Sequence, residues 1–370
     1  MIDVNFRDYL YYPALRTREA EMTGFKQLSE EEKSKIIPLF TLHPWPRADF
    51  LMSITVVKDS VGDNLCFLDL PEFDEVKKKC NENPSLLAQY GHLTSPDNNF
   101  KNWVEILTPY KNIIPIIQTK NSTINQTSKQ VKEFLKHKQR IGFRIKEDQD
   151  IVKVIAALSQ LDDDISNIIV FIDEGFISRA TLANKITHSV KVIEELTSEF
   201  KELTICLLST SFPISPSTEI QNKDSGEIEI LEFELFSQVG FHHSNILYGD
   251  YASIHAQIYD EQRFSGIAAA PRIDYPLIYS WNVRRQKPID GDRASAYQSI
   301  AKLLLSDYPS MTNSSCWGEK KIIDAANGSV FGKSPAQWIS VRVNIHLRNQ
   351  ISSSDSFFTE EIDEFYANDE

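Results

Sequence analysis

The chain has 370 residues, a formal net charge of -13 at pH 7 and 41% hydrophobic residues. These values are typical of a globular protein with one large domain or two small ones. The acidic balance argues against broad non-specific DNA binding, although it leaves a local basic groove open. Nucleic acid is therefore a disfavoured partner rather than one that is ruled out.

The sequence also indicates a cellular compartment. Its first twenty residues lack the basic start and apolar stretch of a signal peptide, and no apolar run approaches the length of a membrane span. The four cysteines form no CxxC pair, which gives a structural zinc site no support. We therefore expect a cytoplasmic protein with no membrane association and no assigned metal ligands.

Eight short apolar runs follow one another along the chain, mostly 25 to 50 residues apart. They begin at Tyr11, Ile36, Asn64, Asn112, Arg140, Asn167, Leu203 and Asn245. Each is rich in Ile, Leu, Val and Phe and lacks polar alternation, as expected for strands of a parallel sheet that is covered on both faces. The segments between them have helical patterns; one begins with a capping box formed by Ser29 and Glu32. Eight strand–helix units predict an α/β fold of the (β/α)8 TIM-barrel type, with an open doubly wound sheet as the alternative.

Three regions are expected. Residues 1–251 form the predicted barrel-like domain, and residues 252–350 form a C-terminal extension packed on it. The extension begins with a ninth strand or a hairpin and continues with helices, the first starting near Asp292. Residues 351–370 are Ser-rich and then acidic, which predicts a disordered tail.

Polar side chains stand where the apolar runs stop, and barrel enzymes build their sites at those strand ends. The residues at these ends are Arg16, Arg18, Thr41, His43, Asp69, Gln118, Lys120, Arg144, Lys146, Asp173, Glu174, Ser209, Ser211 and Asp250. A single polar residue at a strand end is no evidence of a functional site, because strands end at polar surfaces. Together they predict a polar pocket at the carboxyl ends of the strands.

Arg144 lies between apolar neighbours, and a buried arginine needs a partner. Asp173 on the next strand is the natural one. Side chains alternate along a strand, so Asp173 and Glu174 must point to opposite faces. With Arg16 and Asp69, these residues predict an ion-paired core that serves either as scaffold or as site.

The residue types suggest one chemistry for such a site. Arginine offers a bidentate fork to phosphate or carboxylate, and aspartates transfer protons or hold Mg²⁺, the one cofactor that the residues suggest. The catalytic candidates are Asp69, Asp173 and Asp250. The ligand-binding candidates are Arg16, Arg18, Gln118, Arg144 and Ser209, with Trp338, Arg342 and His346 of the extension closing the mouth of the pocket.

The hypothesis is a hydrolase or lyase acting on a phosphorylated or nucleotide-like substrate, and whether the protein is an enzyme stays open. The sequence contains no Walker A, GxGxxG, HExxH or GxSxG motif. The first alternative is a non-catalytic scaffold whose extension binds a partner protein. The second is a nucleic-acid-binding protein, for which the cluster at Arg284 is the only dense basic segment.

An ordered set of short strings resembles a known family. The strings are YYPALRTREAE, IIPLFTL, FIDEG, LLSTSFP, YGDYAS, CWG and PAQWISVRVNIHL, and they extend from about Tyr11 to Leu347. In that order they resemble the Beta protein family of phages and their bacterial relatives. Arg16, Arg18 and Glu21 match the start of the family pattern, whereas Thr41 and Ile345 depart from it. The resemblance implies a barrel-like fold, a phage or mobile-element setting and a role in phage–host conflict such as antiviral defence; it implies no particular reaction.

Overall fold

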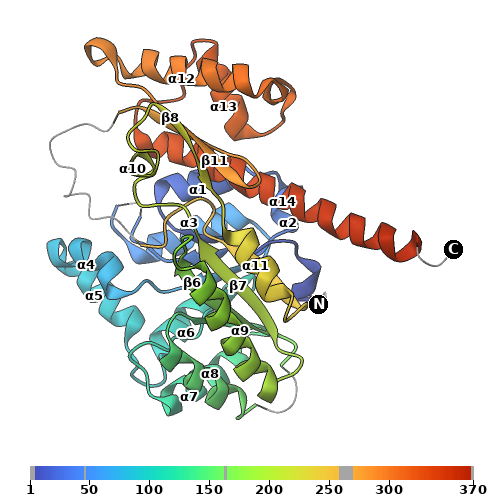
Figure 1. Ribbon diagram of the computed structural model, residues 1–370. Helices are drawn as coiled ribbons and strands as arrows, with labels where there is room; N and C mark the ends of the chain where they lie inside the picture. Colours follow the sequence, from blue (N-terminus) through green and yellow to red (C-terminus); the bar gives the residue numbers. More distant parts are fainter. Residues whose placement is uncertain (1–4, 46, 162–164, 258–269, 368–370) are drawn as a thin grey trace. The chain divides into compact units, whose positions relative to one another are not determined.

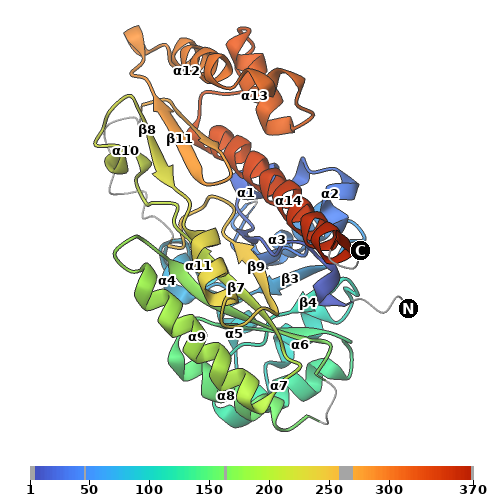
Figure 2. The ribbon, with the colours of Figure 1, turned by 45° about the vertical axis from the view of Figure 1, so that its right-hand side comes forward.

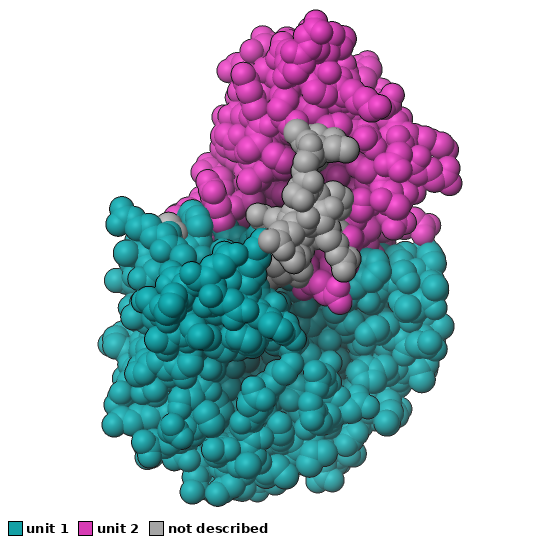
Figure 3. All heavy atoms as spheres, turned by 90° about the vertical axis from the view of Figure 1, so that its left-hand side faces the viewer, with its two compact units in different colours: residues 1–18, 33–210, 231–251 teal, residues 19–32, 211–230, 252–370 magenta. Residues whose placement is uncertain are grey.

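The computed structural model describes residues 5–45, 47–161, 165–257 and 270–367. It divides into two compact units, which Figure 3 distinguishes by colour. Unit 1 comprises residues 1–18, 33–210 and 231–251, and unit 2 comprises residues 19–32, 211–230 and 252–370. Unit 2 thus contains the segment expected as an extension and also two earlier segments that the sequence analysis placed in the barrel.

Unit 1 contains two four-stranded parallel sheets. The strands of the first sheet are β1 (Ala14–Arg16), β2 (Leu39–Thr41), β3 (Cys66–Asp69) and β4 (Ile113–Pro115). Those of the second are β5 (Ile141–Ile145), β6 (Ile168–Phe176), β7 (Thr204–Thr210) and β9 (Ile246–Asp250). The prediction of an α/β protein with parallel strands is confirmed, and each of the eight apolar runs contains one of these strands.

The predicted closed (β/α)8 TIM barrel is wrong, because the eight strands form two separate sheets rather than one continuous ladder. The edges approach each other at single points: a parallel bridge joins Ile116 to Gly142, and the Tyr12 N–H donates to the Tyr248 carbonyl over 3.0 Å. The edge strands β1 and β4 are only three residues long. Proline has no N–H to donate, and backbone groups alternate sides along a strand. Because the Ile117 N–H donates to the Gly142 carbonyl, Pro115 faces β5 as well and offers it no donor.

Aromatic side chains fill the space between the two sheets. Phe67 on β3 packs edge-on against Phe171 on β6, with ring centroids 5.0 Å apart. Tyr12 packs against the same Phe171 at 6.1 Å. Burial of such rings removes large apolar areas from water, and it holds the sheets together without a continuous hydrogen-bond ladder.

Helices of unit 1 follow the strands. In the first half they are α3 (Phe50–Val61), α4 (Phe73–Glu82), α5 (Pro84–Thr94) and α6 (Lys101–Leu107). In the second half they are α7 (Ile124–Leu135), α8 (Asp148–Leu158), α9 (Leu182–Glu199) and α11 (Glu232–Gly240), and a 3-10 turn, η1 (Phe6–Asp8), precedes β1. Figures 1 and 2 show α7, α8 and α9 side by side, where they pack against β5 and β6.

Unit 2 combines a small antiparallel sheet with helices. The sheet has the order β10 (Arg272–Pro276), β11 (Ser280–Arg285) and β8 (Ser225–Glu229). The helices are α1 (Glu19–Lys26), α10 (Pro216–Glu219), α12 (Arg293–Asp307), α13 (Trp317–Ala326) and α14 (Pro335–Ala367), with α2 (Glu30–Ser34) after α1 and 3-10 turns η3 (Ile289–Gly291) and η4 (Pro309–Asn313). The predicted hairpin is β10–β11, and the predicted helix near Asp292 is α12, which that aspartate caps.

One strand of unit 2 was not predicted from the sequence. Strand β8 was missed because alternate residues of this edge strand are exposed, so it carries no apolar run. Helix α14 extends to Ala367, into the segment for which a disordered tail was predicted. Residues 368–370 of that segment lie outside the described residues, and the tail stays a prediction. Helices α1 and α14 pack closely, since a Cβ on Gly24 would lie 2.8 Å from the Ser340 carbonyl oxygen.

Candidate functional site

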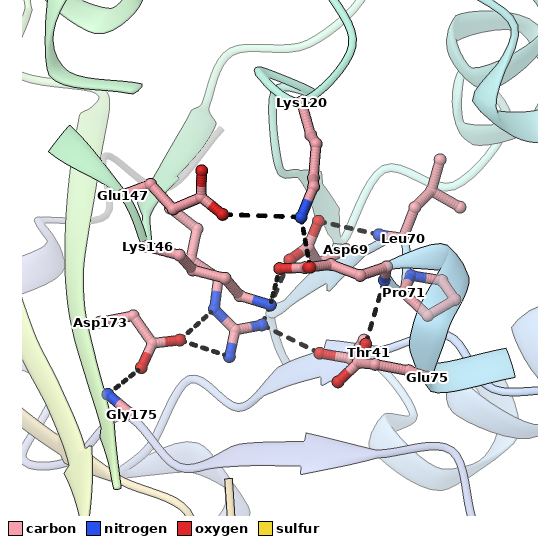
Figure 4. A network of polar contacts seen from close by, with 12 residues as sticks. Thr41, Asp69, Leu70, Pro71, Glu75, Lys120, Lys146, Glu147, Asp173 and Gly175 are labelled. Atoms are coloured by element: carbon pink, nitrogen blue, oxygen red, sulfur yellow. Dashed lines mark hydrogen bonds and ion pairs between the residues drawn. The ribbon is translucent and has the colours of Figure 1, made fainter. Parts of the chain in front are cut away.

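The side chain of Arg144, at the end of β5, is buried and links both sheets of unit 1. Figure 4 labels its partners Thr41, Asp69 and Asp173. Its Nε donates to Oδ2 of Asp173 over 2.8 Å, and its Nη2 lies 2.8 Å from the same oxygen. Its Nη1 donates to the Thr41 hydroxyl at 3.0 Å and to Oδ2 of Asp69 at 3.2 Å. The Nη2 also donates to the Tyr251 hydroxyl at 3.1 Å. Every guanidinium nitrogen therefore has a partner, as a buried charge requires.

Asp173 and Glu174 point to opposite faces of β6, as the alternation along a strand requires. Asp173 accepts hydrogen bonds from Tyr251 and from the Gly175 N–H, in addition to those from Arg144. Burial alone would raise the pKa of Asp173, but Arg144 and, next, Lys146 outweigh it and lower that pKa. The aspartate is thus held as an anion with all of its acceptor positions occupied.

Glu174 binds helix α9 instead. Its Oε1 lies 2.6 Å from Nδ1 of His188 and accepts from the Ser189 hydroxyl at 2.7 Å. Lys185 lies 3.1 Å from Oε2. The second carboxylate of the strand end therefore anchors a helix and lies outside the Arg144 network.

His188 bridges this anchor to α8, since its Nε2 lies 3.0 Å from Oδ1 of Asp148. Burial would lower the pKa of His188, but hydrogen bonds to Glu174 and Asp148 outweigh it and raise that pKa; Lys185 is the nearby cation. A raised pKa means that the folded chain binds the proton more tightly than the unfolded chain does. The stabilisation is therefore complete below about pH 6.5 and is lost as the pH rises through the raised pKa.

We expect the stability difference between the wild type and His188→Gln to be larger near pH 5.5 than near pH 8.5. Urea denaturation of both proteins at the two pH values measures it. Thr187→Gln, one residue earlier on the same helix and exposed, provides the control and should show no such pH dependence. If the stability difference between the wild type and His188→Gln were the same at both pH values, the proposed contribution of protonated His188 would be wrong.

A cavity of about 140 Å³ opens beside the Arg144 network at the ends of β3, β4 and β5. Of the candidates from the sequence, Asp69, Gln118 and Arg144 line it. Its other polar lining residues are Glu72, Asp74, Tyr90, Thr94, Thr119, Lys120, Asn121, Lys146, Glu147, Gln149 and Asp150. Asp69 accepts from the Leu70 N–H and from Gln118 through Oδ1, and from Arg144 through Oδ2. Among the described residues, one acceptor position of Oδ2 therefore has no donor.

Two lysines share one carboxylate in the lining of this cavity. Lys120 binds Oε2 of Glu72, and Lys146 lies 3.3 Å from Oε1 of the same residue. Burial would raise the pKa of Glu72, but Lys146 and Lys120 together lower it. Lys120 also lies 3.7 Å from Glu147, and Figure 4 shows both lysines beside Asp69. The lining thus combines charges of both signs.

The other candidates at strand ends lie elsewhere in unit 1. Arg16 is the ladder partner of Thr41, which in turn pairs with Asp69, so it belongs to the row of residues that meets Arg144. Arg18 is half-buried two residues further on, and after burial these two arginines are the largest causes that lower the pKa of His43. The structure therefore places Arg16 in the same row as two partners of Arg144, and Arg18 lies two residues beyond that row.

Asp250 and Ser209 are ladder partners on the face of the second sheet opposite to Asp173. The hydroxyls of Tyr11 and Tyr248 donate to Asp250, which is fully buried. Asp250 thus lies apart from Asp69 and Asp173. The next residue, Tyr251, contacts Arg144 and Asp173 instead, and the sequence analysis did not predict its role. Alternation was the available signal, because Tyr251 follows Asp250 and must point the other way.

The three candidates of the extension lie in unit 2 on α14, one helical turn apart. Trp338 stacks on Tyr297, with ring centroids 4.7 Å apart, and its indole N–H donates to a backbone carbonyl. His346 lies parallel to the Trp281 ring at 6.5 Å. Arg342 binds Asp274. All three are buried within the unit.

The suggested Mg²⁺ does not fit the two network aspartates. Arg144 contacts both Asp69 and Asp173 and already supplies the positive charge between them. Within the described ranges, no group of three or more His, Cys, Asp or Glu side chains is arranged to hold a metal ion. Within the same ranges, no helix is long and apolar enough to cross a membrane.

Comparison with known proteins identifies the family. The model of the Beta protein family matches residues 11–352. Protein beta of enterobacteria phage P4 is 37% identical to this chain over 360 residues, which cover 95% of this chain and 96% of the phage protein. The resemblance seen in the sequence is confirmed: the chain belongs to the Beta protein family.

Proposed function

We propose that this member of the Beta protein family acts in phage–host conflict and binds a small molecule with one anionic group in the cavity of unit 1. Asp69 is the observation that carries the proposal. It is a buried carboxylate that lines the cavity and has one acceptor position without a donor in the described part of the chain, whereas the acceptor positions of Asp173 are all occupied. A carboxylate in this state accepts a hydrogen bond from a bound hydroxyl or amine.

The lining narrows the class of ligand. Acidic side chains outnumber basic ones in it, which disfavours a polyphosphate. Lys120 and Lys146 share the single carboxylate of Glu72, so one further anionic group can bind between them. The cavity of about 140 Å³ is smaller than the usual ligand pocket, which favours a small hydroxylated phosphate over a nucleotide. If the protein turns this ligand over as a hydrolase or lyase, Asp69 is the residue placed to move the proton.

The test is a titration of sugar phosphates, nucleotides and inorganic phosphate by calorimetry. We expect Lys146→Met to weaken binding by about tenfold or more, because a charge-assisted hydrogen bond is lost. Lys101→Met is the matched control, since this exposed lysine pairs with Glu105 on the surface and does not line the cavity. Asp69→Asn should retain binding of the anionic group but abolish any turnover. Absence of binding by every compound, or binding unchanged in both site variants, would contradict the proposal.

A second candidate function is a non-catalytic scaffold or protein-interaction module in phage–host conflict. One observation favours it: the Arg144 network is internally complete, as a structural ion-pair network is. In that case no small molecule shifts the thermal midpoint of the wild type, and replacements of Lys146 and Lys120 leave phage-related activity intact in cells.

A further inference from the structure

A second buried arginine has unused hydrogen-bond donors. Arg342, on α14 of unit 2, is 3% exposed, and its Nη1 donates to Oδ2 of Asp274. Its Nε is enclosed and has no hydrogen-bond partner among the described residues. The guanidinium carbon lies 4.0 Å from the centre of the Phe212 ring, which holds the plane of the group.

Comparison with Arg144 shows which hydrogen-bond partners the guanidinium group of Arg342 lacks. In Arg144, the edge formed by Nε and Nη2 binds Asp173, and Nη1 has two further partners. In Arg342, only Nη1 donates to Asp274. Nε is enclosed and has no hydrogen-bond partner among the described residues, so the Nε–Nη2 edge is not bound by a carboxylate as it is in Arg144. An unsatisfied buried donor costs free energy, so its retention in a native protein calls for an explanation, such as a bound water, ion or ligand that satisfies it.

The charges around Arg342 also favour an anionic ligand. Asp274 is shared, since Nε of Arg272 lies 2.7 Å from its other oxygen. Two guanidinium groups thus divide one carboxylate, with Glu21 as a further, weaker source of negative charge. The pKa of Arg342 is lowered to about 10, chiefly by burial. The charge of Asp274 raises this pKa, and the charge of Arg272 lowers it further. The positive charge of Arg342 is therefore incompletely compensated.

We propose that Arg342 binds an oxyanion, a carboxylate or phosphate group of a small molecule, through its Nε–Nη2 edge. Two parallel N–H groups match two oxygens of such a group, and no lysine reproduces this geometry. The Phe212 ring stacks against the plane of the guanidinium and keeps the edge oriented. This site lies within unit 2 and does not depend on the function proposed for the cavity of unit 1.

The experiment compares inorganic phosphate and acetate as probes, each titrated at constant ionic strength with chloride as the balancing anion. The readouts are the thermal midpoint and calorimetric affinity of the full chain. We expect at least one probe to raise the wild-type midpoint, with a response that disappears in Arg342→Met and an affinity about tenfold weaker in Arg342→Lys. The probe that acts distinguishes a phosphate from a carboxylate ligand.

Two controls make the result specific. Arg348→Met, on the same helix, removes a guanidinium that pairs with Glu32, and it should keep the full response. Lys146→Met should also keep it, which separates this site from the cavity of unit 1. Without a probe, Arg342→Met should melt at or above the wild-type midpoint, because Asp274 retains Arg272. A full response in both Arg342 variants, or no response of the wild type to either probe, would overturn the proposal.

Discussion

Replacement of Arg144 by methionine should lower the free energy of unfolding by about 3–5 kcal/mol, the cost of breaking a buried ion pair by removing one partner. The change leaves Asp69 and Asp173 buried without their cation, and Thr41 and Tyr251 lose a donor. It also removes a buried polar link between the two sheets of unit 1, which no continuous ladder joins. Urea denaturation near neutral pH measures the loss.

The control is Arg179→Met. Arg179 pairs with Glu234, but the two side chains are 55% and 43% exposed, so the loss should stay below about 1 kcal/mol. A loss of that small size in Arg144→Met would show that the network contributes little to the fold.

The substitution Asp173→Asn removes the negative charge that pairs with Arg144. Its effect on stability distinguishes a catalytic role of Asp173 from a structural one. A catalytic carboxylate is often destabilising where it lies, so its removal would leave stability unchanged or raised. We expect a loss instead, because both oxygens of Asp173 are engaged and Arg144 would lose a charged partner. In the double variant with Arg144→Met the losses should not add, since the residues are in contact.

Replacement of Gly249 by alanine should cost about 1–3 kcal/mol or more, the usual effect of forcing a methyl group into a packed core. A Cβ at this position of β9 would overlap the Tyr12 carbonyl oxygen and lie 2.5 Å from Cδ2 of Leu208. Backbone atoms cannot yield as a flexible side chain does. The strand must move, which would break the 3.0 Å hydrogen bond from the Tyr12 N–H to the Tyr248 carbonyl. Chemical denaturation gives the magnitude.

Gly91→Ala is the matched control. Gly91 lies in α5, and nothing stands within 4 Å of the added Cβ. Alanine favours the helix over glycine by about 0.5–1 kcal/mol, so this variant should be more stable than the wild type. Equal and small effects of the two glycine replacements would mean that β9 is not packed as tightly as its neighbours indicate.

The sequence by itself determined the local structure of this protein. Apolar runs located all eight parallel strands, and the capping box of Ser29 and Glu32 is present, with the Ser29 N–H donating to Glu32 at 2.7 Å. Alternation separated Asp173 from Glu174. A run of apolar residues, a cap or a strand period involves neighbours in the chain, so their residue types suffice to specify it.

Only the tertiary structure decided how these elements combine. Whether β4 pairs with β5, and β1 with β9, depends on the meeting of edges that are distant in the chain. Edge strands of only three residues, with Pro115 in β4, offer few donors for a ladder. The roles of the arginines were decided in the same way. Arg144 and Arg342 look alike in sequence, yet packing surrounds the first with partners and leaves Nε of the second without one among the described residues, because partners are supplied by other segments of the chain.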